Sequence, residues 1–231
     1  MKKTYLILAL LVIASAGRLF AQADMKETIA MIKTNLTESK AKMKNYEWIE
    51  TTTTFLKGEE KSKQQNQCYY SLDGKLTKVA TGGTTQAKEK GGIRGKVIAN
   101  KKEEMGDYVA KAIAKVQTYL PPDGGKIQQI YDGGKVGIQI LEPGKKFKLD
   151  FPDYLEKGDI LSITVDKVNK KLVALAITTS VDNPSEKVIF NVKYSDLPDG
   201  TQYAGETSLD AQAKNLKIVI VNSGFKKASG K

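Results

Sequence analysis

The second half of the chain alternates β-forming segments with turn residues, and this pattern restricts the possible folds more than any other feature of the sequence. Turn signals recur at Asp132-Gly133-Gly134, Pro143-Gly144, Asn169-Lys170 and Pro198-Asp199-Gly200. No helical periodicity separates the segments that these turns join. Strands joined by tight turns are antiparallel, so the sequence predicts an antiparallel meander and not a series of strand–helix–strand units.

The strands of this meander are expected at 126–131, 135–141, 145–151, 159–168, 171–181, 187–197, 201–209 and 215–222. In the 187–197 segment, Val188, Phe190, Val192 and Tyr194 share one face, which indicates a sheet with one apolar side. Apolar residues instead occupy both faces of 171–181 and 215–222. We therefore expect these two strands to be central and covered on both sides.

The first half of the mature sequence opens with an amphipathic helix, predicted over residues 24–45. Its apolar stripe consists of Met25, Ile29, Ile32, Leu36 and Met43. A segment rich in threonine and aromatic residues follows at 46–56 and is predicted to be a strand. Further strands are predicted at 63–72 and 75–80. The Asp73-Gly74 pair predicts a hairpin between the last two.

A glycine- and lysine-rich segment, residues 81–104, interrupts these strands and is expected to be a loop. An inserted helix is expected over residues 102–120, before Pro121-Pro122. The sequence therefore predicts an α+β fold in which a strongly curved antiparallel sheet wraps over two helices. We expect residues 24–225 to form a single domain and residues 226–231 to be a polar tail.

Residues 1–23 have the three regions of a secretory signal peptide. Lys2 and Lys3 precede an apolar run from Tyr5 to Ile13, and Ala21-Gln22-Ala23 supplies small residues at the cleavage site. The alternative is a membrane anchor, but the run is far shorter than the ~20 residues that span a bilayer. We expect cleavage after Ala23 and a periplasmic location. Because Asp24, and not cysteine, follows the cleavage site, no lipid anchor is expected.

The positive charge of the chain does not indicate nucleic-acid binding once export is taken into account. Removal of Lys2, Lys3 and Arg18 with the signal lowers the formal net charge from +11 to +8. The polyanions of the envelope are lipid headgroups, so contact with a membrane surface is one interpretation. The favoured alternative is a solvated, lysine-rich surface, because the lysines are dispersed. Arg94 and Lys96, in the 81–104 segment, are candidates for contacting an anionic group.

The residue types leave little room for catalysis. The chain has no histidine, which excludes Ser-His-Asp and Cys-His nucleophilic sites and the commonest metal ligand. Cys68 is expected to be a buried small hydrophobe. Asp150 and Asp153 are a candidate carboxylate pair, although spacing in sequence does not report separation in space. No catalytic residue, metal or cofactor is predicted.

Aromatic residues spread over several predicted strands are the candidate ligand-binding set. They are Trp48, Phe55, Tyr69, Phe147, Phe151, Phe190 and Tyr194. For any one of them, ordinary core packing is the better interpretation. Collectively, the inner face of a curved sheet can enclose a space that helices cover without filling, and such a space admits a lipid.

The layout resembles the LolA-like periplasmic lipoprotein carriers, the outer-membrane lipoprotein-sorting superfamily. The matching features are the first helix, the 46–56 strand, the Leu72-Asp73-Gly74 hairpin, Pro143 to Leu149, and the segment 187–203 with its Leu197-Pro198-Asp199-Gly200 turn. The resemblance implies an unclosed half-barrel with helices on its concave face, over a cavity for acyl chains. The 81–120 insertion and the absence of a matching arginine are departures from the family's pattern.

We therefore expect a non-enzymatic, monomeric periplasmic protein that binds or carries a lipid or a lipidated protein, and that does not bind nucleic acid. The first alternative is an envelope interaction or sensor domain whose helices fill the cavity. The second is a carboxylate-dependent enzyme.

Overall fold

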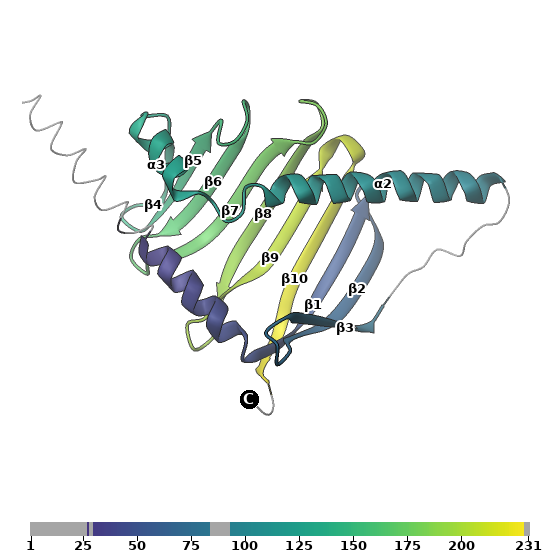
Figure 1. The fold of residues 1–231 in the computed structure, drawn as a ribbon, viewed down its shortest axis with the longest axis horizontal. Helices are drawn as coiled ribbons and strands as arrows, with labels where there is room; N and C mark the ends of the chain where they lie inside the picture. Colours follow the sequence, from purple (N-terminus) through teal and green to yellow (C-terminus); the bar gives the residue numbers. More distant parts are fainter. Residues whose placement is uncertain (1–26, 28–29, 84–92, 229–231) are drawn as a thin grey trace, which may run out of the picture.

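The computed structural model describes residues 27, 30–83 and 93–228, and for residues 93–102 it describes the backbone alone. The strands are β1 (Tyr46–Leu56), β2 (Glu59–Tyr70), β3 (Leu76–Gly82), β4 (Gly137–Glu142), β5 (Lys146–Pro152), β6 (Ile160–Asp166), β7 (Lys171–Ser180), β8 (Lys187–Asp196), β9 (Gln202–Ala211) and β10 (Leu216–Lys227). The described helices are an N-terminal helix over residues 30–43, α2 (Ile93–Gln117), α3 (Gly124–Asp132) and the short 3-10 helix η1 (Gln212–Lys214) (Figure 1).

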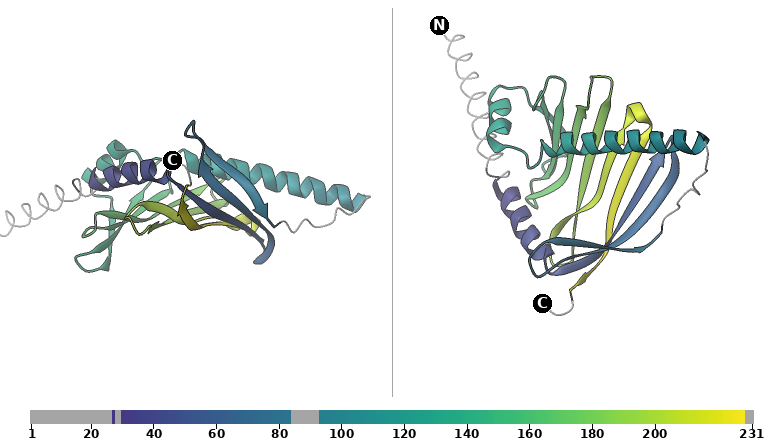
Figure 2. Two further views of the ribbon diagram at one scale, coloured as in Figure 1. Left: turned by 90° about the horizontal axis from the view of Figure 1, so that it is seen from below. Right: turned by 45° about the vertical axis from the view of Figure 1, so that its right-hand side comes forward.

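The ten strands of the described part form one sheet in the order β3-β2-β1-β10-β9-β8-β7-β6-β5-β4. Every neighbouring pair is antiparallel. From β4 to β10 the strands are neighbours in chain order, which confirms the predicted meander for this part. The pairing of β1 with β10 brings the first and last strands together. The sheet is curved and unclosed, with β3 and β4 at its edges (Figure 2), so the fold is α+β as predicted.

The N-terminal helix, α2 and α3 all lie on the same side of the sheet (Figures 1 and 2). We call this side of the sheet the inner face and the opposite side the outer face. Alternation along β8 places Val188, Phe190, Val192 and Tyr194 on the inner face, because their partners on β7 and β9 belong to the core. This confirms the predicted sidedness of β8.

The main core lies between α2, α3 and the inner face. Its buried residues are Tyr108, Ala112, Val116, Tyr119, Ile127, Leu149, Phe151, Tyr154, Leu161, Leu175, Ile177, Val188, Leu209, Ala211 and Leu216. On α2, the spacing of Tyr108, Ala112 and Val116 by four residues puts them on one stripe of the helix surface, and Tyr119 follows in the turn after the helix. Burial of this stripe against the sheet is what holds the second half of α2 in place.

The N-terminal helix packs on a second, smaller cluster. Ile32 is buried there with Val165 of β6 and Leu172 of β7, and Leu36 packs against them. Two hydrogen bonds add to this contact: the Asn35 side chain donates to the carbonyl of Lys170, and the backbone N–H of Gln202 donates to the Ser39 hydroxyl at 2.9 Å. This helix is therefore joined to the sheet by far fewer apolar side chains than α2.

The prediction of a strand over 126–131 is wrong, because these residues lie in α3. Asp123 caps this helix, and its side chain accepts a hydrogen bond from the backbone N–H of Lys126 at 2.8 Å. Ile127 and Ile130, three residues apart, both face the main core. Isoleucine favours strands, but two isoleucines three residues apart lie on the same face of a helix, and Asp123 supplies the N-cap. A helix therefore buries both side chains, whereas a strand would place them on opposite faces. The described part therefore has three α-helices and not the two that were predicted.

Two other boundaries differ from the predictions. The predicted loop over 81–104 is helical from Ile93 onward, because α2 begins there and not at residue 102; residues 84–92 lie outside the described part. The predicted tail begins inside β10, which runs to Lys227. The signal peptide, residues 1–23, also lies outside the described part.

The expectation of two-sided coverage for the central strands is wrong for β10. Its outer face carries Val219 and Val221, and Val221 is 40% exposed. No helix of the described chain lies on the outer face. An antiparallel sheet tolerates one solvated face, and scattered valines on that face need no cover.

Candidate functional site

The helices of the described part leave part of the inner face without a helix over it, across strands β8, β9, β10 and β1. Two rows of cross-strand partners cross this area. One row runs Phe190–Leu209–Ile218–Thr54, and the next runs Val192–Thr207–Ile220–Thr52. We call the half-buried members of these rows the inner patch: Thr52, Thr54, Phe190, Thr207, Ile218 and Ile220.

The inner patch lies between α2 and the N-terminal helix (Figure 1). On the α2 side, the next row of the sheet is Val188–Ala211–Leu216, and these side chains are buried in the main core. On the other side, β8 and β9 continue toward Gln202, which the N-terminal helix contacts through Ser39. The patch is thus an apolar and threonine-lined surface with a helix at each end.

Tyr194 connects the two core clusters, since it packs against both of them. It lies on β8, two residues after Val192, and next to the N-terminal helix. Burial raises the pKa of its phenol, so the hydroxyl stays protonated.

Hydrogen-bonded polar side chains border the inner patch on the side of β1 and β3. The Trp48 indole N–H donates to Asn222 Oδ1 at 3.0 Å, and Asn222 Nδ2 donates to the carbonyl of Ala204 at 2.8 Å. Lys78 of β3 binds both carboxylate oxygens of Glu50 at 2.7 Å. These contacts satisfy polar groups that lie beside Thr52 at this end of the patch.

The seven aromatic residues predicted to line one cavity fall into different places. Phe151 is buried in the main core, and Phe190 and Tyr194 pack against that core. Phe147 packs against the smaller cluster under the N-terminal helix. Trp48 stacks on Phe225 with ring centroids 5.7 Å apart. Tyr69 of β2 lies opposite Glu47 of β1, and Glu47 is on the same face of β1 as Phe55. Tyr69 and Phe55 therefore both lie on the outer face. The structure therefore brings Phe190 and Tyr194 to the candidate site and places Phe55 and Tyr69 on the opposite face.

The threonines and isoleucines of the patch were not singled out from the sequence. The signal that locates them is the period-two alternation of the Thr51 to Thr54 run and of Ile218 to Val221. That alternation separates the two faces of each strand but does not say which face meets the helices. The β1–β10 pairing decides this, because it aligns Thr52 with Ile220 and Thr54 with Ile218.

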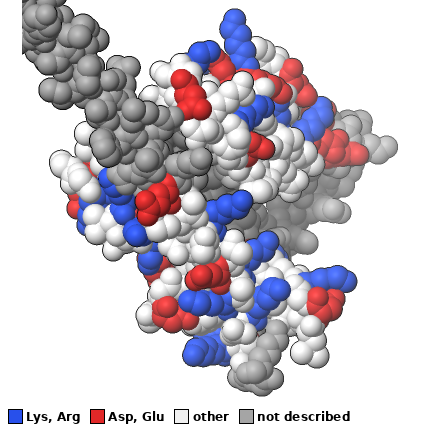
Figure 3. Space-filling view, turned by 60° about the vertical axis from the view of Figure 1, so that its left-hand side comes forward, with Lys and Arg blue, Asp and Glu red and all other residues white. Residues whose placement is uncertain are grey.

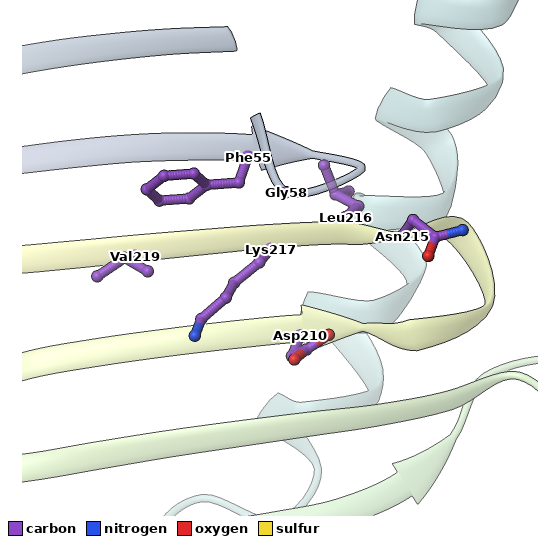
Figure 4. Close-up of a pocket in the computed structure, with 7 residues that line it drawn as sticks. All are labelled: Phe55, Gly58, Asp210, Asn215, Leu216, Lys217 and Val219. Atoms are coloured by element: carbon purple, nitrogen blue, oxygen red, sulfur yellow. The ribbon is translucent and has the colours of Figure 1, made fainter. Parts of the chain in front are cut away.

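Two pockets of the described part open on the outer face. One, of about 440 Å³, lies over β1, β9 and β10 and is lined by Phe55, Gly58, Asp210, Asn215, Leu216, Lys217 and Val219 (Figure 4). The other, of about 280 Å³, lies over β5 to β10 and has Lys148, Lys193 and Lys217 among its lining residues. Two of these lysines are in ion pairs: Lys148 with Asp150 at 3.0 Å and Lys193 with Glu206 at 2.9 Å.

The charged side chains show no surface of a single sign in the view of Figure 3, where lysines and carboxylates are interspersed. Arg94 and Lys96, the candidates for contacting an anionic group, lie on the α2 backbone, and their side chains are outside the described part. The interspersed charges agree with the favoured interpretation of the lysines as a solvated surface.

The candidate carboxylate pair is engaged in local contacts. Asp150 accepts a hydrogen bond from the Ser162 hydroxyl and pairs with Lys148. Asp153 accepts from the backbone N–H of Gly158 at 2.7 Å, inside a turn. Among the described residues, no group of three or more Asp, Glu or Cys side chains is arranged to hold a metal ion. A search of the same residues finds no helix with the length and apolarity needed to cross a bilayer.

Comparisons with known proteins add little. No protein-family model matches the chain, and no curated protein matches its sequence. The crystal structure of a DUF1329 family protein from Desulfovibrio piger aligns with 87% of this chain and 94% of that chain, at a TM-score of 0.31 and 10% sequence identity. At this TM-score the likeness carries no argument about fold or function.

Proposed function

We propose that the protein is a non-enzymatic periplasmic protein that binds a lipid, or the acyl chain of a lipidated protein, on the inner patch. In this proposal the curved sheet is a half-barrel whose concave side is the inner face. The observation that carries it is the row structure of the patch. Phe190, Ile218 and Ile220 face the helix side of the sheet and are half-buried; Phe190 and Ile218 pack against the main core, whereas Ile220 belongs to neither core cluster of the described residues. In the next row, under α2, Val188, Ala211 and Leu216 are buried.

Binding would be passive in this mechanism. Acyl chains would lie along the patch between α2 and the N-terminal helix, and each buried methylene would contribute about 0.8 kcal/mol. The N-terminal helix is the element that would move aside, because its packing rests on Ile32 and Leu36 with two hydrogen bonds. The second half of α2 would stay in place as a wall, since its stripe belongs to the main core. The resemblance in layout to LolA-like carriers supports the same mechanism.

The test is native mass spectrometry of the protein purified from the periplasm, before and after repeated delipidation. The expected result is a retained lipid mass that Ile220→Asp removes. Val221→Asp is the matched control, because Val221 is the next residue on β10 and lies on the outer face. Thr52→Asp, on the strand beside Ile220, is a second inner-face variant in case the first does not fold.

A wild-type mass that delipidation never changes would contradict lipid binding. Equal lipid loss in Ile220→Asp and Val221→Asp, with both variants folded by circular dichroism, would contradict the location.

One observation favours the alternative of an interaction or sensor domain. Beneath α2 the space between helix and sheet is filled, with Ala112, Ile177 and Val188 all fully buried. A protein whose helices only complete the core would show this packing without any ligand. The two proposals separate on the same experiment, because the interaction domain is expected to show no lipid at any stage of purification.

A further inference from the structure

The edge strand β4 has an unusual surface. In the described part of the chain it pairs with β5 alone, so one row of its backbone N–H and carbonyl groups has no strand beside it. Ile138 and Ile140 are 56% and 62% exposed, and Leu141 is 49% exposed. Free edges of this kind invite pairing, and soluble proteins usually protect them with lysine, proline or a cover. The six residues of β4 contain neither lysine nor proline.

The opposite edge of the sheet differs in the arrangement of its apolar residues. On β3, Leu76 and Val79 are exposed, but their odd spacing places them on different faces. On β4, Ile138 and Ile140 pair with Leu149 and Phe147 of β5, so both belong to the inner face. Only β4 therefore combines a free backbone edge with a continuous apolar strip.

We propose that β4 is the site at which a second copy of this chain binds, by antiparallel pairing of β4 with β4 across a two-fold axis. In such a pair, the inner faces of the two copies lie on the same side of the joined sheet when inner-face residues of one β4 are opposite inner-face residues of the other. This condition restricts the possible registers. Among these, the register centred on Gln139 places Ile138 of each copy opposite Ile140 of the other. The four isoleucines then lie side by side and form one apolar cluster on the inner faces of the two copies.

The apolar strip, and not charge, selects a second copy as the partner. Glu142, which ends the strand, already pairs with Lys145 and Lys146 of the same chain. A second copy brings an identical strip, and the register centred on Gln139 sets isoleucine opposite isoleucine. The strand is thus self-complementary in its apolar residues.

This inference replaces the expectation of a monomer, and the reason is the correction at α3. Residues 126–131 were expected to pair with 135–141 as a hairpin, which would have covered this edge. Since 126–131 are helical, no strand of the described part covers this edge. The proposed dimer does not depend on lipid binding, because the patch lies on β8, β9, β10 and β1, away from β4.

The first experiment measures self-association of the protein, expressed from its full sequence, by sedimentation equilibrium over a wide concentration range. We expect a monomer–dimer equilibrium, with the dissociation constant raised about 10- to 100-fold in Ile138→Lys and in Ile140→Lys. Val168→Lys is the control, because Val168 is 63% exposed in the β6–β7 turn. A monomer at every concentration, or equal effects of Ile140→Lys and Val168→Lys, would overturn the proposal.

The second experiment tests the register by disulfide cross-linking. Residue 139 lies on the proposed two-fold axis, so its two copies would have Cα atoms about 4.5–5.5 Å apart, within the range that a disulfide spans. Gln139→Cys is expected to form a covalent dimer under mild oxidation. Leu72→Cys, at a residue 95% exposed in a distant turn, is expected not to. Equal cross-linking of the two variants, or a β4-dependent complex with a different protein in place of the dimer, would refute pairing between copies.

Discussion

Removing the hydroxyl of Tyr119 is expected to destabilise the protein, because this group ties the end of α2 to the sheet. Tyr119 is 1% exposed, and its hydroxyl donates to the carboxylate of Asp159 and lies 3.0 Å from the Thr179 hydroxyl. Asp159 is also buried and keeps one further hydrogen bond, from the Glu156 backbone N–H at 2.9 Å. Burial and the bond to Asp159 both raise the pKa of the Tyr119 phenol, so the hydroxyl stays protonated and able to donate.

The magnitude follows from the kind of hydrogen bond that is lost. A hydrogen bond to a charged group contributes about 1.5–3 kcal/mol, and in Tyr119→Phe the buried Asp159 Oδ2 keeps the Glu156 backbone N–H and loses the Tyr119 hydroxyl. We therefore expect the free energy of unfolding to fall by about 2 kcal/mol and the Tm by about 4–8 °C. Urea unfolding monitored by the fluorescence of Trp48, the one tryptophan of the chain, measures this change.

Tyr108→Phe is the matched control, with an expected change of the opposite sign or near zero. Tyr108 lies on the stripe of α2 and is buried, but its hydroxyl has no hydrogen-bond partner in the part of the chain that the structure describes. Removing a buried hydroxyl without a partner costs nothing and can stabilise. The Lys214 ammonium, 4.9 Å from the ring centroid, would keep its contact with the Phe ring. Equal destabilisation of the two variants would refute the role given to the Tyr119–Asp159 bond.

Other predictions test the acid dependence, the core and the thiol. The backbone N–H of Thr201 and the Tyr46 hydroxyl lower the pKa of Asp199 to about 2, so its ionised form stabilises the fold above about pH 4 and that contribution disappears as the pH falls to about 2. Acid unfolding of Asp199→Asn should therefore differ most from wild type above pH 4 and converge with it near pH 2; a constant difference would contradict this. Leu161→Ala should lower the unfolding free energy by about 2–5 kcal/mol, because Leu161 is fully buried, whereas Leu72→Ala should change it by less than about 0.5 kcal/mol in the same urea titration. Burial raises the pKa of the Cys68 thiol, so it should react with a thiol reagent in urea and not in the native protein; fast native reaction would show that this end of the sheet opens.

The sequence predicted the strands of the meander because strand alternation and turn chemistry are local. The Val188 to Tyr194 alternation needs no knowledge of distant residues, and neither does the Asn169-Lys170 turn, where Lys170 has a positive φ of 54°. The prediction failed at α3 because Ile127 and Ile130 suit a strand by residue type, and only the helix cap and the core above the sheet decide in favour of a helix.

The candidate site was less predictable than the fold. Aromatic residues were chosen because they dominate most ligand sites, yet the side chains of the patch are mainly threonine and isoleucine. Phe190 was predicted correctly as an inner-face residue of β8. Phe55 was placed with it, although it lies on the outer face, because the sequence contains no signal for the face of β1 that meets the helices.

By itself, the sequence determined which segments are strands and which residues alternate along each one, since both follow from properties of neighbouring residues. Three features were decided by the tertiary structure alone. They are the pairing of β1 with β10, the face of the sheet that the helices cover, and the position of β4 as an edge strand of the described sheet. Each depends on contacts between residues far apart in the chain, such as Thr52 with Ile220. Local sequence patterns are compatible with several tertiary arrangements of these strands and helices. Burial of the apolar α2 stripe against β5 to β10 selects one of them. The inner patch and the β4 edge are consequences of that selection.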